Sequence, residues 1–249
     1  MIKFIFRLTK GEVLSQTIGI LGGMGPAATV RMFNLIVKLT KAETDQDHIP
    51  IIIFNNPKVP DRTAAILDEG PSPLPMLIEG AKTLEKAGAN FIIMPCHTAH
   101  YHYDEIIQHV TIPFLHLQEE TRRYVEWRYG DLTRFGLLAT TGTVKTDLFQ
   151  NIFYQKGLEI IVPEEKEQEM VMTAVYGERG IKRGFKKEPR QLLMQVIKQL
   201  KEQKVEAVIA GCTEVSLVLN AEELQLSVID PLKIIATAAI LKAGYELKR

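Results

Sequence analysis

Two cysteines each follow a short apolar segment and stand beside polar residues that could assist them. Cys96 follows residues 91–94 and begins the run Cys-His-Thr, and Cys212 follows residues 207–210 and begins the run Cys-Thr-Glu. If a helix follows each segment, its dipole lowers the pKa of the thiol, and the threonine can cap it. The simpler alternative is two buried thiols that pack as small apolar groups. The pattern favours two reactive thiols.

The first cysteine could also belong to a metal site with the three histidines that follow it, His97, His100 and His102. Thiolate and imidazole are both zinc ligands. However, the spacing Cys-His-x-x-His-x-His matches no usual zinc pattern, and the three histidines would not share one face of a helix. We therefore expect no metal, and we interpret His100 and His102 as surface residues.

A glycine-rich loop, Gly-Gly-Met-Gly-Pro at residues 22–26, follows the first apolar segment. Read as Gly23-x-Gly25-x-x-Ala28, it imitates a dinucleotide-binding fingerprint. The second apolar segment ends in two asparagines at 55–56, so no acidic residue is present there to bind a ribose. The loop is better interpreted as a place where backbone N–H groups approach a small anion, and no nicotinamide cofactor is expected.

The second half of the chain has a hydroxyl-rich loop at the equivalent position, Thr-Thr-Gly-Thr at residues 140–143. Its hydroxyl and N–H groups could bind a carboxylate or an ammonium group, or they could cap a helix. Two cationic residues are weaker candidates. Arg62 has the fork geometry that binds carboxylates, but its neighbour Asp61 suggests a surface pair, and Lys182 lies in a basic stretch, 181–187, that is typical of a solvated face.

The elements that must position these residues form an α/β pattern. Amphipathic helices, such as 74–86 and 192–203, separate apolar segments that are predicted as strands. The predicted strands are 18–21, 51–54, 91–94, 114–117, 135–139, 158–162, 207–210 and 226–229. Uninterrupted apolar strands that alternate with helices indicate parallel sheet covered on both faces.

The chain also matches itself. Ile-Gly-Ile-Leu at 18–21 corresponds to Phe-Gly-Leu-Leu at 135–138, an offset of 117 residues, and Cys96 corresponds to Cys212 at an offset of 116. Two matches at nearly one offset predict a duplicated α/β unit. Since ligands bind at the carboxyl ends of strands in such sheets, two facing halves would place the two thiols on opposite sides of one ligand.

Composition sets the remaining limits. The 249 residues contain 30 basic and 30 acidic side chains, so there is no overall attraction to nucleic acid or to an anionic membrane. No apolar run is long enough to span a bilayer, and the N-terminal residues make a poor signal peptide. Two cysteines do not build a disulfide framework. We expect a reduced, cytoplasmic protein, and residues 1–15 have no predicted role.

Taken together, the motifs resemble the Asp/Glu racemase superfamily, in particular its cofactor-independent aspartate racemases. The resemblance covers residues 17–240 and is carried by five motifs in order: GILGGMGP (19–26), PDRT (60–63), PCHTAH (95–100), IKRG (181–184) and GCTE (211–214). Glutamate racemases typically carry Asp-Ser in the first loop, where this chain has Gly-Gly-Met. This difference favours the aspartate branch.

The resemblance implies two pseudo-duplicated Rossmann-like domains with parallel sheets and an active site in the cleft between them. The first domain would comprise residues 1–117 plus 222–249, and the second residues 118–221. The resemblance also implies a homodimer, a small dicarboxylic amino acid as substrate and no cofactor.

Residue roles follow from the same resemblance. Cys96 and Cys212 would be the acid/base pair, with Cys212 acting on the L enantiomer and Cys96 on the D enantiomer. Arg62 and Lys182 would bind the side-chain carboxylate. The α-carboxylate and ammonium side would be lined by Met24, His97, Thr98, Thr141 and Thr213. The family usually has asparagine at position 97, and a histidine there could become charged near pH 6.5.

The predicted function is racemisation of aspartate, with glutamate as a second substrate, by proton transfer between two thiols. Related reactions of the superfamily, such as maleate isomerisation, are alternatives. So is a non-catalytic protein that binds dicarboxylates. An NAD-linked oxidoreductase is the alternative from another class.

Overall fold

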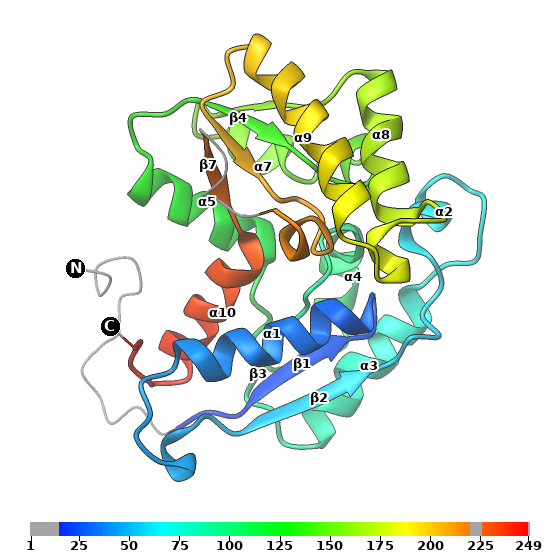
Figure 1. Ribbon diagram of the computed structural model, residues 1–249. Helices are drawn as coiled ribbons and strands as arrows, with labels where there is room; N and C mark the ends of the chain where they lie inside the picture. Colours follow the sequence, from blue (N-terminus) through cyan, green and yellow to red (C-terminus); the bar gives the residue numbers. More distant parts are fainter. Residues whose placement is uncertain (1–14, 220–225, 249) are drawn as a thin grey trace.

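The computed structural model describes residues 15–219 and 226–248. It contains two separate parallel sheets (Figure 1), one from each half of the chain. The segment 1–15, which has no predicted role, lies almost entirely outside the described residues. None of the helices in the described ranges is both long and apolar enough to cross a membrane.

The first sheet has the strand order β2-β1-β3. Its strands are β1 (Ile18–Gly22), β2 (Ile51–Asn55) and β3 (Phe91–Ile93), and all pairs are parallel. The connecting elements are α1 (Pro26–Leu39), η2 (Asp45–Asp47), α2 (Arg62–Ile66) and α3 (Leu74–Lys86). Proline at the first position of α1 fits because that N–H has no partner inside the helix. The predicted helix 74–86 is confirmed.

The second sheet has the order β5-β4-β6-β7 and is also parallel. Its strands are β4 (Arg134–Leu137), β5 (Glu159–Ile161), β6 (Ala207–Ile209) and β7 (Ser227–Ile229). The helices of this half are α6 (Thr141–Lys145), α7 (Gln150–Tyr154), α8 (Glu165–Tyr176), η4 (Ile181–Arg183) and α9 (Lys187–Glu202). The predicted helix 192–203 is the C-terminal part of α9.

Both faces of each sheet are covered, as predicted. Ile18 and Ile20 pack with α1 on one face of the first sheet, and Leu21 and Ile92 pack with α3 on the other. In the second sheet, Val208 packs with α8 and α9, whereas its neighbours Ala207 and Ile209 pack with α7. Alternate residues of a strand point to opposite faces, so apolar strands without interruption require two cores.

The two sheets repeat one arrangement. In each half the first strand lies between the second and the third, and the fourth strand position lies beside the third. In the first half this position is occupied by a single bridge, Ile92 to Phe114, so the predicted strand 114–117 is wrong. The reason is that α5 (Leu117–Arg128) begins at Leu117, where the ring of His116 accepts the N–H of Glu119 as an N-cap.

In each half, the helix that follows the fourth strand position packs against the other half. α10 (Pro231–Lys242) packs against α1 and α5, and its Leu232 and Ile235 enter the core of the first sheet. Conversely, Val125 of α5 packs with Phe135 of the second sheet. The two helices therefore cross between the halves and contact each other (Figure 1).

The predicted domain boundaries need one correction. Residues 222–249 were assigned to the first domain, but β7 pairs with β6 in the second sheet. The chain leaves that sheet at Asp230, which caps α10 with its carboxylate. The chain returns to the first half from α10 onward, whereas β7 completes the edge of the second sheet. The first core buries the apolar surface of α10 and is packed by Tyr245 and Leu247, and Leu247 also forms a bridge with Thr40. The rest of the division stays a prediction.

Three short elements follow the carboxyl ends of the third strands. These are η3 (Thr98–His102) and α4 (Tyr103–Ile107) after β3, and η5 (Val215–Leu217) after β6. Cys96 thus precedes a 3-10 turn that continues into a short helix, and Cys212 precedes a single 3-10 turn, where the sequence pattern predicts a helix after each.

Close packing of α3 on the first sheet leads to a stability prediction. A Cβ atom at Gly80 would lie 2.5 Å from Leu21 Cδ1 and 2.9 Å from Phe54 Cδ1. We expect Gly80→Val to lower the free energy of unfolding by about 1–3 kcal/mol through overpacking. Chemical denaturation measures the change, and Glu79→Val, on the exposed side of the same helix, is the control. Equal stability of the two variants would contradict this packing.

Candidate active site

One cavity lies where the carboxyl ends of the two sheets face each other. The first half contributes Met24, Arg62, Cys96, His97 and Thr98. The second half contributes Thr140, Tyr176, Lys182, Cys212, Thr213 and Glu214. The two cysteines, 116 positions apart in the sequence, therefore line one space, as the duplicated arrangement requires.

Eight of the nine predicted site residues line this cavity, and Thr141 does not. Thr141 begins α6, where its N–H contacts the sulfur of Met172 and its hydroxyl accepts a hydrogen bond from Gln168. Thr140, one residue earlier, lines the cavity in its place. The prediction missed by one position because only the tertiary structure shows where the loop ends and the helix begins.

The halves meet beside the cavity through a cluster of hydroxyl groups. The hydroxyl of Thr98 lies 3.0 Å from that of Thr140 and 2.9 Å from that of Thr143. Nearby, a Cβ atom at Gly142 would lie only 3.0 Å from Thr63 Cα, so the backbones approach closely. Thr98 therefore joins the halves instead of capping a helix, and the predicted caps at Thr98 and Thr213 are wrong.

Tyr176 makes a second contact across the cleft. Its hydroxyl donates to Asp61 Oδ2 at 3.2 Å, which links α8 to the N-cap of α2, directly before Arg62. Burial and the charge of Asp61 raise the pKa of Tyr176 well above its usual range, so the phenol stays protonated and remains a donor. The cavity between these contacts has a volume of about 10 Å³ for the centre of a water-sized sphere, which is room for about one water molecule. A larger ligand requires the halves to separate.

Cys212 is held by the residue two positions after it. Its thiol donates to Glu214 Oε2 at 3.1 Å, and Glu214 Oε1 accepts from Lys182 Nζ at 3.0 Å. Burial, followed by the charge of Glu214, raises the pKa of Cys212 well above its usual value. The expected lowering of its pKa is therefore wrong for this closed state, because desolvation outweighs the effect of one short turn.

Arg62 is buried, and its Nη1 group donates to backbone carbonyls. Its Nη1 donates to the carbonyls of Val59 at 3.2 Å and Pro60 at 2.8 Å. The expected surface pair with Asp61 is wrong, since that carboxylate caps α2 through the N–H of Ala64. Among the described residues, the Nε of Arg62 has no hydrogen-bond partner, so one donor is available to a ligand.

Lys182 leaves its basic stretch and enters the site. Besides its bond to Glu214, its ammonium lies 5.3 Å from the centre of the Tyr176 ring. Residue 182 and the neighbouring basic residues 183, 186 and 187 are all exposed, so the solvated-face interpretation holds for the stretch. The side chain of Lys182 is the exception, since it is only 24% exposed, pairs with Glu214 and lines the cavity. Gly184, in a left-handed conformation at φ 89°, ends the short η4 turn that carries this lysine.

His97 is buried against Phe149, with ring centres 5.2 Å apart. Within the described part of the chain, neither ring nitrogen has a hydrogen-bond partner. Burial, and secondarily the charge of His116, lowers the pKa of His97 to about 3. The expected charging near pH 6.5 is therefore wrong for the closed state. A neutral imidazole lines the cavity with one N–H donor and one acceptor.

His100 and His102 are both buried, contrary to the prediction that they lie at the surface. His100 Nδ1 donates to the carbonyl of Cys96 at 2.7 Å, and its Nε2 accepts the N–H of Leu117 at 3.2 Å. These partners define a neutral imidazole with the proton on Nδ1. The ring connects the backbone of the first cysteine to the start of α5. Residue 100 therefore fixes the position of Cys96 instead of binding a ligand.

No metal site is visible in the described residues, since no three His, Cys, Asp or Glu side chains among them are grouped to hold an ion. The zinc alternative for Cys96 also loses one ligand on geometric grounds. Both ring nitrogens of His100 are engaged by backbone groups.

Two cavity residues have no role in the sequence analysis, Tyr176 and Glu214, and Thr140 is present there only as part of the hydroxyl-rich loop. The signal for Glu214 was its place directly after Cys-Thr. Tyr176 carried no signal, because only the packing of α8 across the cleft brings it to the site.

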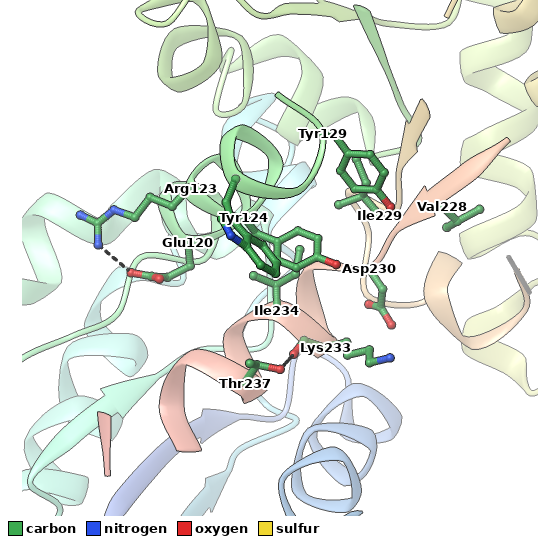
Figure 2. Close-up of a pocket in the computed structure, with 11 residues that line it drawn as sticks. Glu120, Arg123, Tyr124, Tyr129, Val228, Ile229, Asp230, Lys233, Ile234 and Thr237 are labelled. Carbon is green, nitrogen blue, oxygen red and sulfur yellow. Dashed lines mark hydrogen bonds and ion pairs between the residues drawn. The ribbon is translucent and has the colours of Figure 1, made fainter. Parts of the chain in front are cut away.

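A larger cavity lies elsewhere, at the contact between α5 and the β7–α10 segment (Figure 2). The aromatic residues Tyr124, Trp127 and Tyr129 line it together with Ile229 and Ile234. Its charged residues carry both signs, and it contains none of the chemically reactive residues of the cleft. We therefore assign the chemistry to the smaller cavity between the halves.

Comparison with known proteins finds relatives over most of the chain. The model of the Asp/Glu/Hydantoin racemase family matches residues 21–239. The broad specificity amino-acid racemase RacX of Bacillus subtilis (strain 168) is 28% identical over 227 residues, 90% of this chain and 96% of that protein.

Solved structures are similar over nearly the whole chain. Picrophilus torridus aspartate racemase is 30% identical, with a TM-score of 0.84, covering 94% of this chain and 96% of that one. A glutamate racemase from Francisella tularensis subsp. tularensis SCHU S4 has a TM-score of 0.65 at 17% identity, covering 92% and 82%, which shows a shared fold.

The neutral, buried state of His97 predicts a pH dependence of stability. Its pKa is 6.5 in the unfolded chain and about 3 in the folded one, so between these values the unfolded state binds more protons. Stability should therefore fall as the pH drops below 6.5, by up to about 1.4 kcal/mol per pH unit. In His97→Asn, a smaller loss is expected between pH 6 and pH 4 in thermal unfolding. Surface His109→Asn is the control, and identical profiles of the two variants would contradict a buried neutral His97.

Proposed function

We propose that this chain, which belongs to the Asp/Glu/hydantoin racemase family, racemises aspartate by proton transfer between two thiols. The observation that supports this most directly is that Cys96 and Cys212 occupy equivalent places in two repeated halves and line one cavity. Racemisation removes the α-proton from one face and returns a proton to the other. A thiolate on one side and a thiol on the other perform both steps and exchange roles at each turnover.

The carbanion-like transition state needs stabilisation without a cofactor. We propose that the α-carboxylate accepts hydrogen bonds from the neutral imidazole of His97 and from the hydroxyls beside it. Donors already fixed in a closed, dry cavity stabilise developing charge more strongly than water does. The Thr98–Thr140 contact holds such donors at the junction. Binding and release then require the cleft to open and close.

Arg62 and Lys182 are the proposed anchors of the side-chain carboxylate. They approach the cavity from opposite halves, so a ligand that binds both draws the halves together. With the far end of the substrate fixed, Cα is held between the thiols. Arg62 is suited to this because its Nε has no partner among the described residues.

A second candidate is racemisation of amino acids without a side-chain carboxylate. It is favoured by the ion pair between Lys182 and Glu214, which already neutralises one anchor. The related RacX is described as a broad specificity amino-acid racemase. Comparing α-proton exchange for aspartate, glutamate, alanine and lysine separates the two candidates, and maleate added to the panel tests isomerisation.

We also propose a cytoplasmic homodimer. Reduced thiols suit the cytoplasm. The outer side of α1 exposes Val30, Phe33 and Val37 at 68%, 42% and 37%, with Lys38 the one charged residue among its exposed side chains. An uncharged apolar stripe can pair with its own copy across a two-fold axis without repulsion between like charges.

The two-thiol reaction predicts the behaviour of two variants. Cys96→Ser and Cys212→Ser should each lower the racemisation of aspartate by at least about a hundredfold, because a serine hydroxyl is a much weaker acid than a thiol. The assay follows deuterium incorporation at Cα of L-aspartate and of D-aspartate in heavy water. Each variant should lose more exchange from one enantiomer than from the other, because each thiol is proposed to deprotonate one of them. Full activity in either variant would refute the scheme.

The dimer predicts a change in assembly. Phe33→Asp should convert the protein to a monomer in sedimentation velocity, because the charge would be buried against the same face of the partner. Tyr154→Asp, at an apolar side chain that is 82% exposed outside this stripe, should leave the assembly unchanged. A monomeric parent protein, or a dimeric Phe33→Asp variant, would reject this interface.

A further inference from the structure

Glu214 is a buried carboxylate that the proposed reaction does not yet use. It is only 4% exposed. Its Oε1 accepts from Lys182, and its Oε2 accepts both the thiol of Cys212 and the hydroxyl of Thr213, the latter at 2.9 Å. One side chain thus contacts a proposed catalytic thiol and a proposed substrate anchor at the same time.

Resting on the proposed function, we propose that Glu214 is the base that takes the proton of Cys212, and that the side-chain carboxylate of the substrate triggers this transfer by drawing Lys182 away from Glu214. The catalytic thiolate would then form only when a dicarboxylate is bound. Lys182 would act as both anchor and switch.

Before binding, the proton lies on sulfur. Burial alone would raise the pKa of Glu214, but the charge of Lys182 and hydrogen bonds from Cys212, Lys182 and Thr213 outweigh it, so this pKa is lowered. The pKa of Cys212 is raised, first by burial and then by the charge of Glu214. The pair therefore consists of a neutral thiol donating to an ionised carboxylate.

Binding of a dicarboxylate changes the balance at Glu214. Arg62 gives Nη1 to two carbonyls, which leaves its Nε for the ligand, so Lys182 must supply the other charged contact to a carboxylate in the cavity. As the ammonium turns toward the ligand, Glu214 loses a direct hydrogen bond and its nearest positive charge while it remains buried. Lys182 also lowers the pKa of Cys212, but through its charge alone, so its movement raises the pKa of Glu214 more than that of Cys212. Desolvation then favours its neutral form.

The proton moves along the existing 3.1 Å contact. The S–H bond of Cys212 breaks and its electron pair stays on sulfur, while an O–H bond forms at Glu214 Oε2. The net charge of the site does not change, because the negative charge only passes from oxygen to sulfur. The new thiolate lies in the cavity that holds the ammonium group of the substrate, which stabilises it further.

This coupling has two consequences for the enzyme. The resting thiol is protected, since oxidation follows thiolate character. An amino acid without a side-chain carboxylate can occupy the cavity without generating the thiolate. Discrimination would then appear in kcat more than in KM.

The chain allows a direct test because it contains only two cysteines. In Cys96→Ala, the ultraviolet absorbance of thiolate reports Cys212 alone, titrated with and without succinate, a dicarboxylate without an amino group. We expect succinate to lower the apparent pKa of Cys212 by at least about one unit and butyrate to leave it unchanged. In Cys96→Ala/Glu214→Gln, succinate should leave that pKa unchanged or raise it, because Lys182 is then the main group that favours the thiolate. Cys96→Ala/Glu165→Gln, altered at the exposed Glu165, is the matched control.

Absence of the succinate effect in Cys96→Ala, through lack of binding or otherwise, would overturn the proposal. So would an equal effect in the Glu214→Gln variant. With both cysteines present, Glu214→Gln should lower kcat for aspartate at least about a hundredfold without raising KM, whereas a purely structural role would raise KM.

Exchange of the α-proton of aspartate by the unaltered protein is measured in parallel. If exchange occurs and the thiol does not respond, only this inference fails. If no exchange occurs, the proposed function fails.

Discussion

The contact of Thr98 with Thr140 and Thr143 is the constraint on which the site depends, because it fixes how two similar sheets face each other. Each half by itself carries one cysteine and one cationic residue at the carboxyl ends of its strands. The chemistry needs both sets around one carbon atom. The crossing of α5 and α10 supports this contact from behind, since each helix contributes to the core of the other half.

Burial then determines the electrostatics of the cleft. Burial in the closed cleft holds the thiol of Cys212, the phenol of Tyr176 and the ring of His97 in their neutral forms. The charges that persist are those with close partners, above all Lys182 beside Glu214. A site of this kind binds its substrate by exchanging partners among groups that are already charged, and this costs less than creating new charge in a desolvated space.

Backbone groups provide the rigidity that the reaction requires. His100 ties the carbonyl of Cys96 to the first N–H of α5, and Arg62 is held by carbonyls of its own loop. Neither residue depends on a flexible surface partner. The positions of the thiol and of the anchor are therefore set by the ends of secondary-structure elements, which move less than isolated side chains.

Much of this was determined by the sequence itself. Uninterrupted apolar strands required sheets buried on both faces. The repeated offset placed Cys96 and Cys212 at equivalent strand ends, because the succession of strands and helices along the chain follows from the local pattern. Eight of the nine predicted residues line the cavity for that reason.

What the sequence could not decide depends on groups distant in the chain. The burial that neutralises His97, the recruitment of Tyr176, the choice of Thr140 over Thr141 and the return of α10 without β7 all arise from packing between the halves. Local pattern carries no information on that packing, since desolvation and cross-cleft hydrogen bonds exist only once both halves are folded together.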